Sequence, residues 1–280
     1  MCPMNPRLLR PLASGVHPEA NAWRTAVVAN GGSVSASTMK AVSTFCAAID
    51  LAGIRDRFYR LNLFAGTGLN ACLVPLYRGQ SRTGTQYGNT TDTNVGPFVS
   101  GDYAETGASG GLKGNGTSKY LDTGFLANTL TQSGRHLGVV FQASTVEAAG
   151  RYWFGTDNFG CDSNAFWGVG TSSSTSNTNR CSNGTSAFTN TISGKPHVLV
   201  SGNGAAASYV NGSAGSTINQ TAFTAPAQAI YIFAQNRCNT PADYSPVRVL
   251  QYSIGDSMTA GQVSSLNTAL AAFQTALSRA

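Results

Sequence analysis

Glycoside hydrolysis is the first chemistry to test against this 280-residue sequence, because it needs two carboxylates that flank one bond. The three glutamates, Glu19, Glu105 and Glu147, are isolated from one another and belong to no common motif. The acidic residues therefore do not predict a glycosidase that works through two carboxylates.

A serine nucleophile is the next chemistry to consider. Gly255-Asp256-Ser257 resembles the GDS block of SGNH-type hydrolases, in which the serine attacks an ester. Only 23 residues follow this block, and none of them is a histidine that could act as the base. We interpret the block as a polar turn before a final helix.

Histidine spacing gives no further catalytic pattern. His17, His136 and His197 lie far apart and lack the spacing of metal ligands, so we expect structural or exposed roles for them. With no paired carboxylates and no serine–histidine set, we predict that the protein is not an enzyme.

Metal and disulfide chemistry is only weakly indicated. Asp122, Asp157 and Asp162 stand near predicted strand ends and offer oxygen ligands, so calcium is kept as an alternative to the expected absence of any cofactor. None of the six cysteines forms a C-x-x-C pair, which disfavours zinc. Cys161 and Cys181 flank a loop-rich stretch and could pair across a hairpin.

A dense group of aromatic residues stands beside a Ser-, Thr- and Asn-rich stretch. Its candidate contact residues are Trp153, Phe159, Phe166, Trp167 and Asn183. Aromatic rings and amides bind sugars by stacking and hydrogen bonding, so the region is a candidate contact for a glycan or a protein. The other interpretation is that these rings fill a core.

The net charge of +6 is concentrated at the start of the chain. Residues 1–82 carry nine basic and three acidic groups, whereas the rest of the chain is balanced. We therefore predict that this segment anchors the protein to an acidic partner surface. The candidate anchoring residues are Arg7, Arg10, Arg24, Arg55, Arg57 and Arg60. Nucleic acid is disfavoured as the partner because no binding motif accompanies these charges.

The elements that would position these groups begin with an extended arm and helices. Four prolines within residues 1–20 predict an extended arm. A short helix near Trp23–Ala29 follows, and apolar spacing predicts a helix over about 38–52 that is capped by Ser37 or Thr38 and ends at Gly53.

From residue 58 onward, short β-branched and aromatic runs alternate with Gly-, Asn- and Ser-rich turns, which predicts an antiparallel sheet protein. The clearest predicted strands are 59–64, 137–142, 151–155, 165–170, 197–201, 207–210, 230–234 and 247–254. Asn-Gly pairs at 115–116, 183–184, 203–204 and 211–212 predict tight hairpins.

A final helix is predicted after Thr259, which forms a capping box with Gln262. Its apolar stripe consists of Val263, Leu266, Leu270, Phe273 and Leu277. We expect this stripe to pack on the same chain, against the N-terminal helix or the sheets, and the alternative is a subunit interface.

Three stretches together resemble the concanavalin A-like and laminin G-like sandwich family. They are residues 111–124, the pair 195–201 and 208–212, and the run 247–263. The chain also resembles minor structural proteins of tailed bacteriophages that carry this sandwich. The resemblance implies a two-sheet jelly roll whose concave face or loop edge binds glycans in some relatives.

These observations predict a mainly β protein, an antiparallel two-sheet jelly-roll sandwich with an N-terminal helical segment and a C-terminal helix. We expect residues 1–57 to form the arm and helices, 58–256 the sandwich, and 257–280 the closing helix. The predicted function is that of a virion structural or decoration protein, with acidic assembly subunits as partners and a homo-oligomeric state. The alternative is a glycan-binding lectin module for adhesion to host-surface glycans. No window predicts a membrane span or a secretory signal, and we expect the protein in the virion, or otherwise at an extracellular surface.

Overall fold

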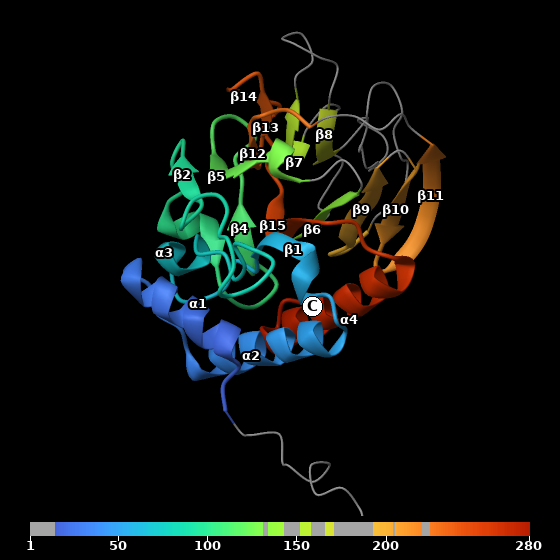
Figure 1. Cartoon of the computed structure of the whole chain (residues 1–280). Helices are drawn as coiled ribbons and strands as arrows, with labels where there is room; N and C mark the ends of the chain where they lie inside the picture. Colours follow the sequence, from blue (N-terminus) through green and yellow to red (C-terminus); the bar gives the residue numbers. More distant parts are fainter. Residues whose placement is uncertain are drawn as a thin grey trace, which may run out of the picture.

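The computed structural model describes residues 15–130, 134–142, 152–157, 166–170, 193–203, 205–219 and 225–280 (Figure 1). Within these ranges the chain is mainly β, with two sheets, helices at its N-terminal end and one helix at its C-terminal end. The mainly β prediction is confirmed.

The first sheet runs through the middle of the molecule. In spatial order it contains β11 (Ser213–Asn219), β10 (Ala205–Val210), β9 (His197–Asn203), β6 (Arg135–Gln142), β15 (Arg248–Gly255), β4 (Gly111–Lys113) and β3 (Tyr103–Ala104), and β1 (Phe58–Asn62) also pairs with β15. The second sheet contains β14 (Thr240–Ala242), β13 (Gln235–Arg237), β7 (Tyr152–Asp157), β12 (Ala229–Ile232), β5 (Tyr120–Leu126) and β2 (Thr93–Val95), and β8 (Phe166–Gly170) pairs with β7. Each of the eight predicted strands corresponds to one of these elements.

The two sheets pack face to face over a shared core. Alternate residues of β6 and β9, including Val139 and Val198, meet residues of β5 and β12, including Phe125 and Ile230, in one buried cluster. This alternation is the expected pattern for strands with one face on a core. One expectation is wrong: β13 pairs with β7 in parallel, because the chain reverses direction after β12, which is antiparallel to β7, and crosses to the other edge of β7.

Four α-helices are present in the described ranges. They are α1 (Pro18–Ala29), α2 (Ala36–Leu51), the short α3 (Leu69–Cys72) and α4 (Ala260–Ala276), with short 3₁₀ turns at Arg55–Arg57, Ser100–Asp102 and Ala127–Thr129. Figure 1 shows α1, α2 and α4 together on one side of the first sheet.

The N-terminal helices begin earlier than their sequence signals indicated. Pro18 does not extend the arm but starts α1, since the first helical position needs no backbone N–H and suits the fixed φ of proline. Ser35, and not Ser37 or Thr38, caps α2 by accepting a bond from the Thr38 backbone N–H at 3.1 Å. The chain leaves the helix at Gly53, whose φ of +62° is left-handed, as predicted.

A second buried cluster joins these helices to the outer face of the first sheet. It contains Val42 and Phe45 of α2, Leu266 and Phe273 of α4, and sheet residues that include Leu199. The Phe45 and Phe273 rings meet edge to face at 6.0 Å. The Thr259–Gln262 capping box is present, and the predicted packing of the final helix on the N-terminal helix and the sheet is confirmed.

The Asn-Gly turns have mixed outcomes. Asn211 and Gly212 adopt positive φ and form the two-residue turn between β10 and β11, as predicted. β9 and β10 pair antiparallel, with Asn203 opposite Ala205, and residue 204 of the pair at 203–204 lies outside the described residues. The pair at 115–116 instead lies on a connection from one sheet to the other, since β4 and β5 belong to different sheets. The pair at 183–184 lies outside the described residues.

Candidate functional site

The aromatic contact residues from the sequence map onto the second sheet only in part. Trp153 lies in β7, and Phe166 and Trp167 lie in β8. Phe159 and Asn183 lie outside the described residues. The proposed contact role of this region therefore stays a prediction.

The six candidate anchoring arginines do not form one surface. Arg7 and Arg10 lie outside the described residues, and Arg24 is exposed on α1. Arg57 is half-buried beside Asp56. The anchoring prediction is wrong for Arg60, because β1 turns this side chain into the interior, where it is completely buried.

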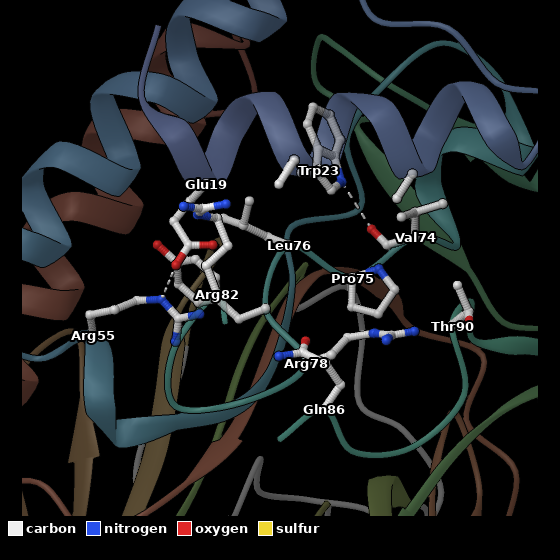
Figure 2. Close-up of a pocket in the computed structure, with 13 residues that line it drawn as sticks. Glu19, Trp23, Arg55, Val74, Pro75, Leu76, Arg78, Arg82, Gln86 and Thr90 are labelled. Carbon is white, nitrogen blue, oxygen red and sulfur yellow. Dashed lines mark hydrogen bonds and ion pairs between the residues drawn. The ribbon is translucent and has the colours of Figure 1, made fainter. Parts of the chain in front are cut away.

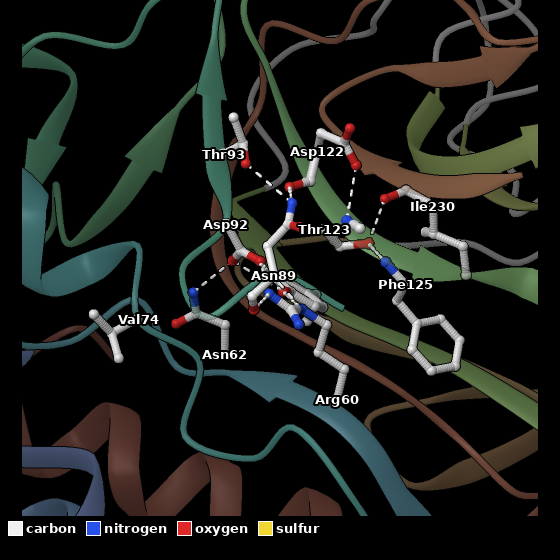
Figure 3. A network of polar contacts seen from close by, with 12 residues as sticks. Arg60, Asn62, Val74, Asn89, Asp92, Thr93, Asp122, Thr123, Phe125 and Ile230 are labelled. Atoms are coloured by element: carbon white, nitrogen blue, oxygen red, sulfur yellow. Dashed lines mark hydrogen bonds and ion pairs between the residues drawn. The ribbon is translucent and has the colours of Figure 1, made fainter. Parts of the chain in front are cut away.

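Arg60 is the centre of a buried polar network between the sheets and the loop after α3 (Figure 3). Its guanidinium donates to Asp92 at 2.6 Å, to the Tyr252 hydroxyl at 2.9 Å, and to the carbonyls of Tyr87 and Asn89, both at 3.0 Å. Every nitrogen of the guanidinium thus has an acceptor, as a buried cation requires.

Asp92 completes this network from the opposite side. Its carboxylate also accepts from the Asn62 amide at 2.8 Å and from the Tyr252 hydroxyl at 2.7 Å. Asn62 in turn donates to the Cys72 carbonyl at 3.0 Å. The network fixes the loop that carries residues 86–92 onto β1 and β15.

A surface cavity of about 210 Å³ lies directly beside this fixed loop (Figure 2). Its wall on one side is α1, where the Trp23 indole N–H donates to the Val74 carbonyl at 3.1 Å. The other side is the segment from Val74 to Thr90. We call this cavity the arginine pocket, because its lining includes Arg55, Arg78 and Arg82.

Arg55 has its charge balanced inside the pocket wall. Its Nε donates to Glu19 of α1 at 2.9 Å, and its Nη1 donates to the Gly79 carbonyl at 2.7 Å. Its guanidinium also stacks over the Tyr77 ring, 3.7 Å from the ring centre. This ion pair connects α1 to the pocket, so Arg55 has a structural role here.

Arg78 and Arg82 differ from Arg55 because, among the described residues, neither forms an ion pair with the one carboxylate of the lining, that of Glu19. Among the residues that the structure describes, neither guanidinium has an ion pair or a side-chain hydrogen bond. Arg78 is half-buried, and both its burial and the nearby charge of Arg60 lower its pKa. The pocket lining holds three guanidiniums and one carboxylate, that of Glu19, so the cavity carries excess positive charge.

Little in the sequence indicated this site. Arg78 and Arg82 contributed to the N-terminal charge excess, but they stand in a Gly-, Ser- and Thr-rich stretch with no recognised motif. What makes them a site is the loop that Arg60 fixes and the helix α1 that faces it.

The groups examined for catalysis have structural partners in the fold. Glu19 pairs with Arg55, and Glu105 accepts from the Thr38 hydroxyl at 2.6 Å and the Gly66 N–H at 2.9 Å. Asp256 and Ser257 lie in the turn between β15 and α4, as predicted for the Gly-Asp-Ser block. Glu147 lies outside the described residues.

The histidines also occupy defined positions. His17 precedes α1 and pairs with Asp50 at 2.9 Å. Burial lowers the pKa of both His136 and His197 to about 4, so both rings are neutral at pH 7. His136 is fixed by a contact of 2.7 Å between its Nδ1 and the Asp256 carbonyl.

The described residues show no metal site, and their three cysteines differ in state. Within the described ranges, no group of three or more His, Cys, Asp or Glu side chains could hold a metal ion. Cys46 and Cys72 are free and buried, and Cys238 is disulfide-bonded. Cys161 and Cys181 lie outside the described residues. None of the described helices has the length and apolar character needed to cross a bilayer.

Comparison with known proteins finds similarity in structure alone. No protein-family model matches the sequence, and no curated protein is similar to it. A mutant of Trypanosoma rangeli sialidase that displays trans-sialidase activity matches with a TM-score of 0.51 at 11% identity, over 84% of this chain and 39% of that one. This similarity concerns the fold.

Two further solved structures match less closely. Trypanosoma rangeli sialidase in complex with sialic acid has a TM-score of 0.46 at 14% identity, over 74% of this chain and 32% of that one. A receptor binding domain has a TM-score of 0.49 at 12% identity, over 78% of this chain and 52% of that one. This chain thus corresponds to about a third to a half of the length of these proteins.

The prediction that the protein is not an enzyme is not upheld, because the structure that matches with a TM-score of 0.51 is a sialidase, which is an enzyme. Sialidases are an exception to the scheme with two carboxylates, since their nucleophile is a tyrosine. The isolated glutamates therefore do not decide whether this chain catalyses a reaction. The resemblance to phage structural proteins has no match among the family models.

Proposed function

We propose that this chain is a carbohydrate-binding β-sheet module that receives the acidic group of a glycan in the arginine pocket. The observation that carries the proposal is the excess of positive charge in this cavity, where three guanidiniums face one carboxylate and neither Arg78 nor Arg82 forms an ion pair within the described residues.

The electrostatics of the pocket favour an anionic group. A half-buried cation that lacks a partner loses hydration without gaining an ion pair, and the lowered pKa of Arg78 reflects this cost. A carboxylate in the cavity would restore the balance, and the planar guanidinium can bind it through two parallel hydrogen bonds. Arg55 would contribute less, because Glu19 already neutralises it.

The other groups in the cavity suit a sugar better than an inorganic anion. Gln86 and Thr90 add an amide and a hydroxyl to the lining, and both can donate and accept hydrogen bonds with sugar hydroxyls. The solved structures of similar fold include sialidases, one of them in complex with sialic acid, which is a carboxylated sugar. Sialic acid is the ligand of that sialidase, and we choose a sialylated sugar as the acidic glycan to test on this chain.

A glycan is also favoured over nucleic acid. A phosphate backbone is bound by a row of cations along an extended surface. The uncompensated charges of the arginine pocket are instead confined to one small cavity. The glycan-binding role replaces the virion role as the main proposal. A virion location, a homo-oligomeric state and anchoring through Arg7, Arg10, Arg24 and Arg57 stay predictions.

Binding to sialyllactose, with lactose as the uncharged comparison, tests the proposal by isothermal titration calorimetry. We expect saturable binding of sialyllactose at low salt, and a loss of about 10- to 100-fold in affinity for Arg78→Gln or Arg82→Gln, since each removes a charge-assisted hydrogen bond. Arg24→Gln is the matched control, because Arg24 is an exposed arginine on α1 that does not line this pocket.

Two results would contradict the proposal. The first is equal affinity for lactose and sialyllactose, which would mean that the acidic group is not recognised. The second is unchanged binding in the Arg78→Gln, Arg82→Gln double variant, which would place the ligand elsewhere, for example at the predicted contact residues Trp153 and Trp167 on the second sheet.

We also propose that the two packed sheets form a concanavalin A-like jelly roll. The support is the face-to-face core between the sheets and the sequence resemblance over residues 111–263. An experimental structure in which all strands are traced would decide it, since the proposal requires the full strand order of that fold.

A further inference from the structure

A second cavity, of about 240 Å³, lies between α4 and the first sheet. We call it the α4 cavity. It is lined by Val140 of β6, His197 of β9, the Asn211 turn, and α4 residues that include Asn267 and Gln274. Figure 1 shows α4 running beneath β9, β10 and β11 on this side of the sheet.

The α4 cavity has buried polar groups that lack partners. Gln274 is only 6% exposed, and neither its Oε1 nor its Nε2 has a hydrogen-bond partner in the described residues. His197 is 3% exposed; the Asn267 amide faces its ring, but neither ring nitrogen makes a hydrogen bond of normal geometry. Both side chains line the cavity, so their unmet hydrogen-bonding groups indicate that a polar ligand binds there.

The unpartnered groups continue below the cavity along the sheet. Gln251 of β15 pairs in register with Val140 of β6, and Val140 pairs with His197 of β9, so these residues form one row across three strands. Both amide atoms of Gln251 are buried without a partner among the described residues.

The next row holds a serine and a glycine. Ser253 of β15 pairs with Gly138 of β6, and the Ser253 hydroxyl is also buried without a partner in the described chain. A Cβ placed on Gly138 would lie 2.7 Å from the Ser253 Oγ and 3.3 Å from the His197 Nε2. The glycine therefore keeps open a space that both polar atoms border.

The two cations at the cavity are already engaged by the chain itself. Lys195 donates to the Arg279 carbonyl. Arg279 donates to the backbone carbonyls of Glu105, Leu63 and Phe64. The unpartnered groups are neutral: the Gln274 amide and, at pH 7, the uncharged His197 imidazole in the lining, and the Gln251 amide and Ser253 hydroxyl below it.

The chemistry of these groups selects the ligand. An amide, a hydroxyl and a neutral imidazole can each donate and accept a hydrogen bond, whereas an anion would require donors only. Hydroxyl groups of a ligand also donate and accept, so a molecule with several hydroxyls matches the set. The size of the cavity suits a molecule smaller than those bound by pockets of typical drug-binding size.

We propose that the α4 cavity binds a small neutral polyol, of the size of one monosaccharide, through Gln274 and His197. This site is separate from the arginine pocket in position and in ligand class, and it does not depend on the proposed function. The only lining residues it needs belong to α4, β6 and β9.

Ligand-observed NMR and titration calorimetry with glucose, galactose, mannose, myo-inositol and glycerol test this proposal on the full chain. We expect at least one of these polyols to bind saturably, and Gln274→Leu to weaken that binding about tenfold or more. Gln274→Leu should also leave the unliganded protein as stable as the wild type or more so, because it removes two unmet buried polar atoms. Ser265→Ala, on the exposed face of α4, is the matched control and should bind as the wild type.

Further variants keep the test decisive. Asn267→Ala changes a half-buried helix position at the cavity and should weaken polyol binding even if Gln274→Leu does not fold. Arg78→Gln should leave polyol binding unchanged, which separates this proposal from the arginine pocket. Polyol binding that is unchanged in both Gln274→Leu and Asn267→Ala would overturn the proposal. The proposal would also be overturned if none of the five polyols bound saturably and the cavity held only ordered water.

Discussion

Replacing Asp92 by Asn is the sharpest test of how the arginine pocket is built. Asp92 and Arg60 are completely buried, and their side chains meet at 2.6 Å. The variant keeps the shape of the side chain but leaves the Arg60 charge without a counter-charge in the interior. Breaking a buried ion pair in this way costs about 3–5 kcal/mol of unfolding free energy. That is a large part of the roughly 5–15 kcal/mol available to a folded protein.

Urea denaturation followed by circular dichroism measures this cost directly. Asp243→Asn is a closely matched control, because Asp243 also meets an arginine, Arg237, at 2.6 Å, but both side chains are about a third or more exposed. An exposed pair contributes about 0–1 kcal/mol. If Asp92→Asn were no more destabilising than Asp243→Asn, the reasoning that burial makes this network necessary would be refuted.

Two further predictions concern buried positions of the first sheet. Burial lowers the pKa of His136 and His197 to about 4 from the ordinary 6.5, so on acidification the unfolded chain takes up protons before the folded one. The unfolding free energy measured by urea denaturation should therefore be constant above about pH 6.5 and fall from there to pH 4, by up to about 3 kcal/mol for each ring, and a flat profile would contradict the neutral buried state. Gly255→Ala should destabilise the protein by at least about 1–3 kcal/mol, because its Cβ would lie 1.7 Å from the Arg57 carbonyl oxygen. Gly261→Ala, at the start of α4 with open space around it, should be neutral or stabilising when both variants are compared by thermal unfolding, and equal effects of the two variants would argue against a steric cause.

The sequence was informative wherever a pattern belongs to a single element. The stripe from Val263 to Leu277, with the Thr259 cap, predicted α4, and alternating apolar runs predicted eight strands. These signals are local, because capping and side-chain periodicity depend on residues within a few positions of one another. The same local character explains the early start of α1, where Pro18 suits either an extended arm or the first helical turn.

The candidate site could not be predicted in this way. Composition placed Arg55, Arg60, Arg78 and Arg82 in one basic segment, but only the fold separated them into a structural ion pair, a buried network and two uncompensated charges. The partners that make the difference, such as Tyr252, are distant along the chain.

What the sequence determined by itself was the three longer helices, eight of the strands, the mainly β character and the uneven distribution of charge. What only the tertiary structure decided was which side chains are buried and what faces them, including the parallel pairing of β13 with β7 and the unmet groups of Gln274 and His197. The physical reason is that burial and charge compensation depend on contacts between distant segments, and a periodic pattern shows which face of an element is buried but not what that face will meet.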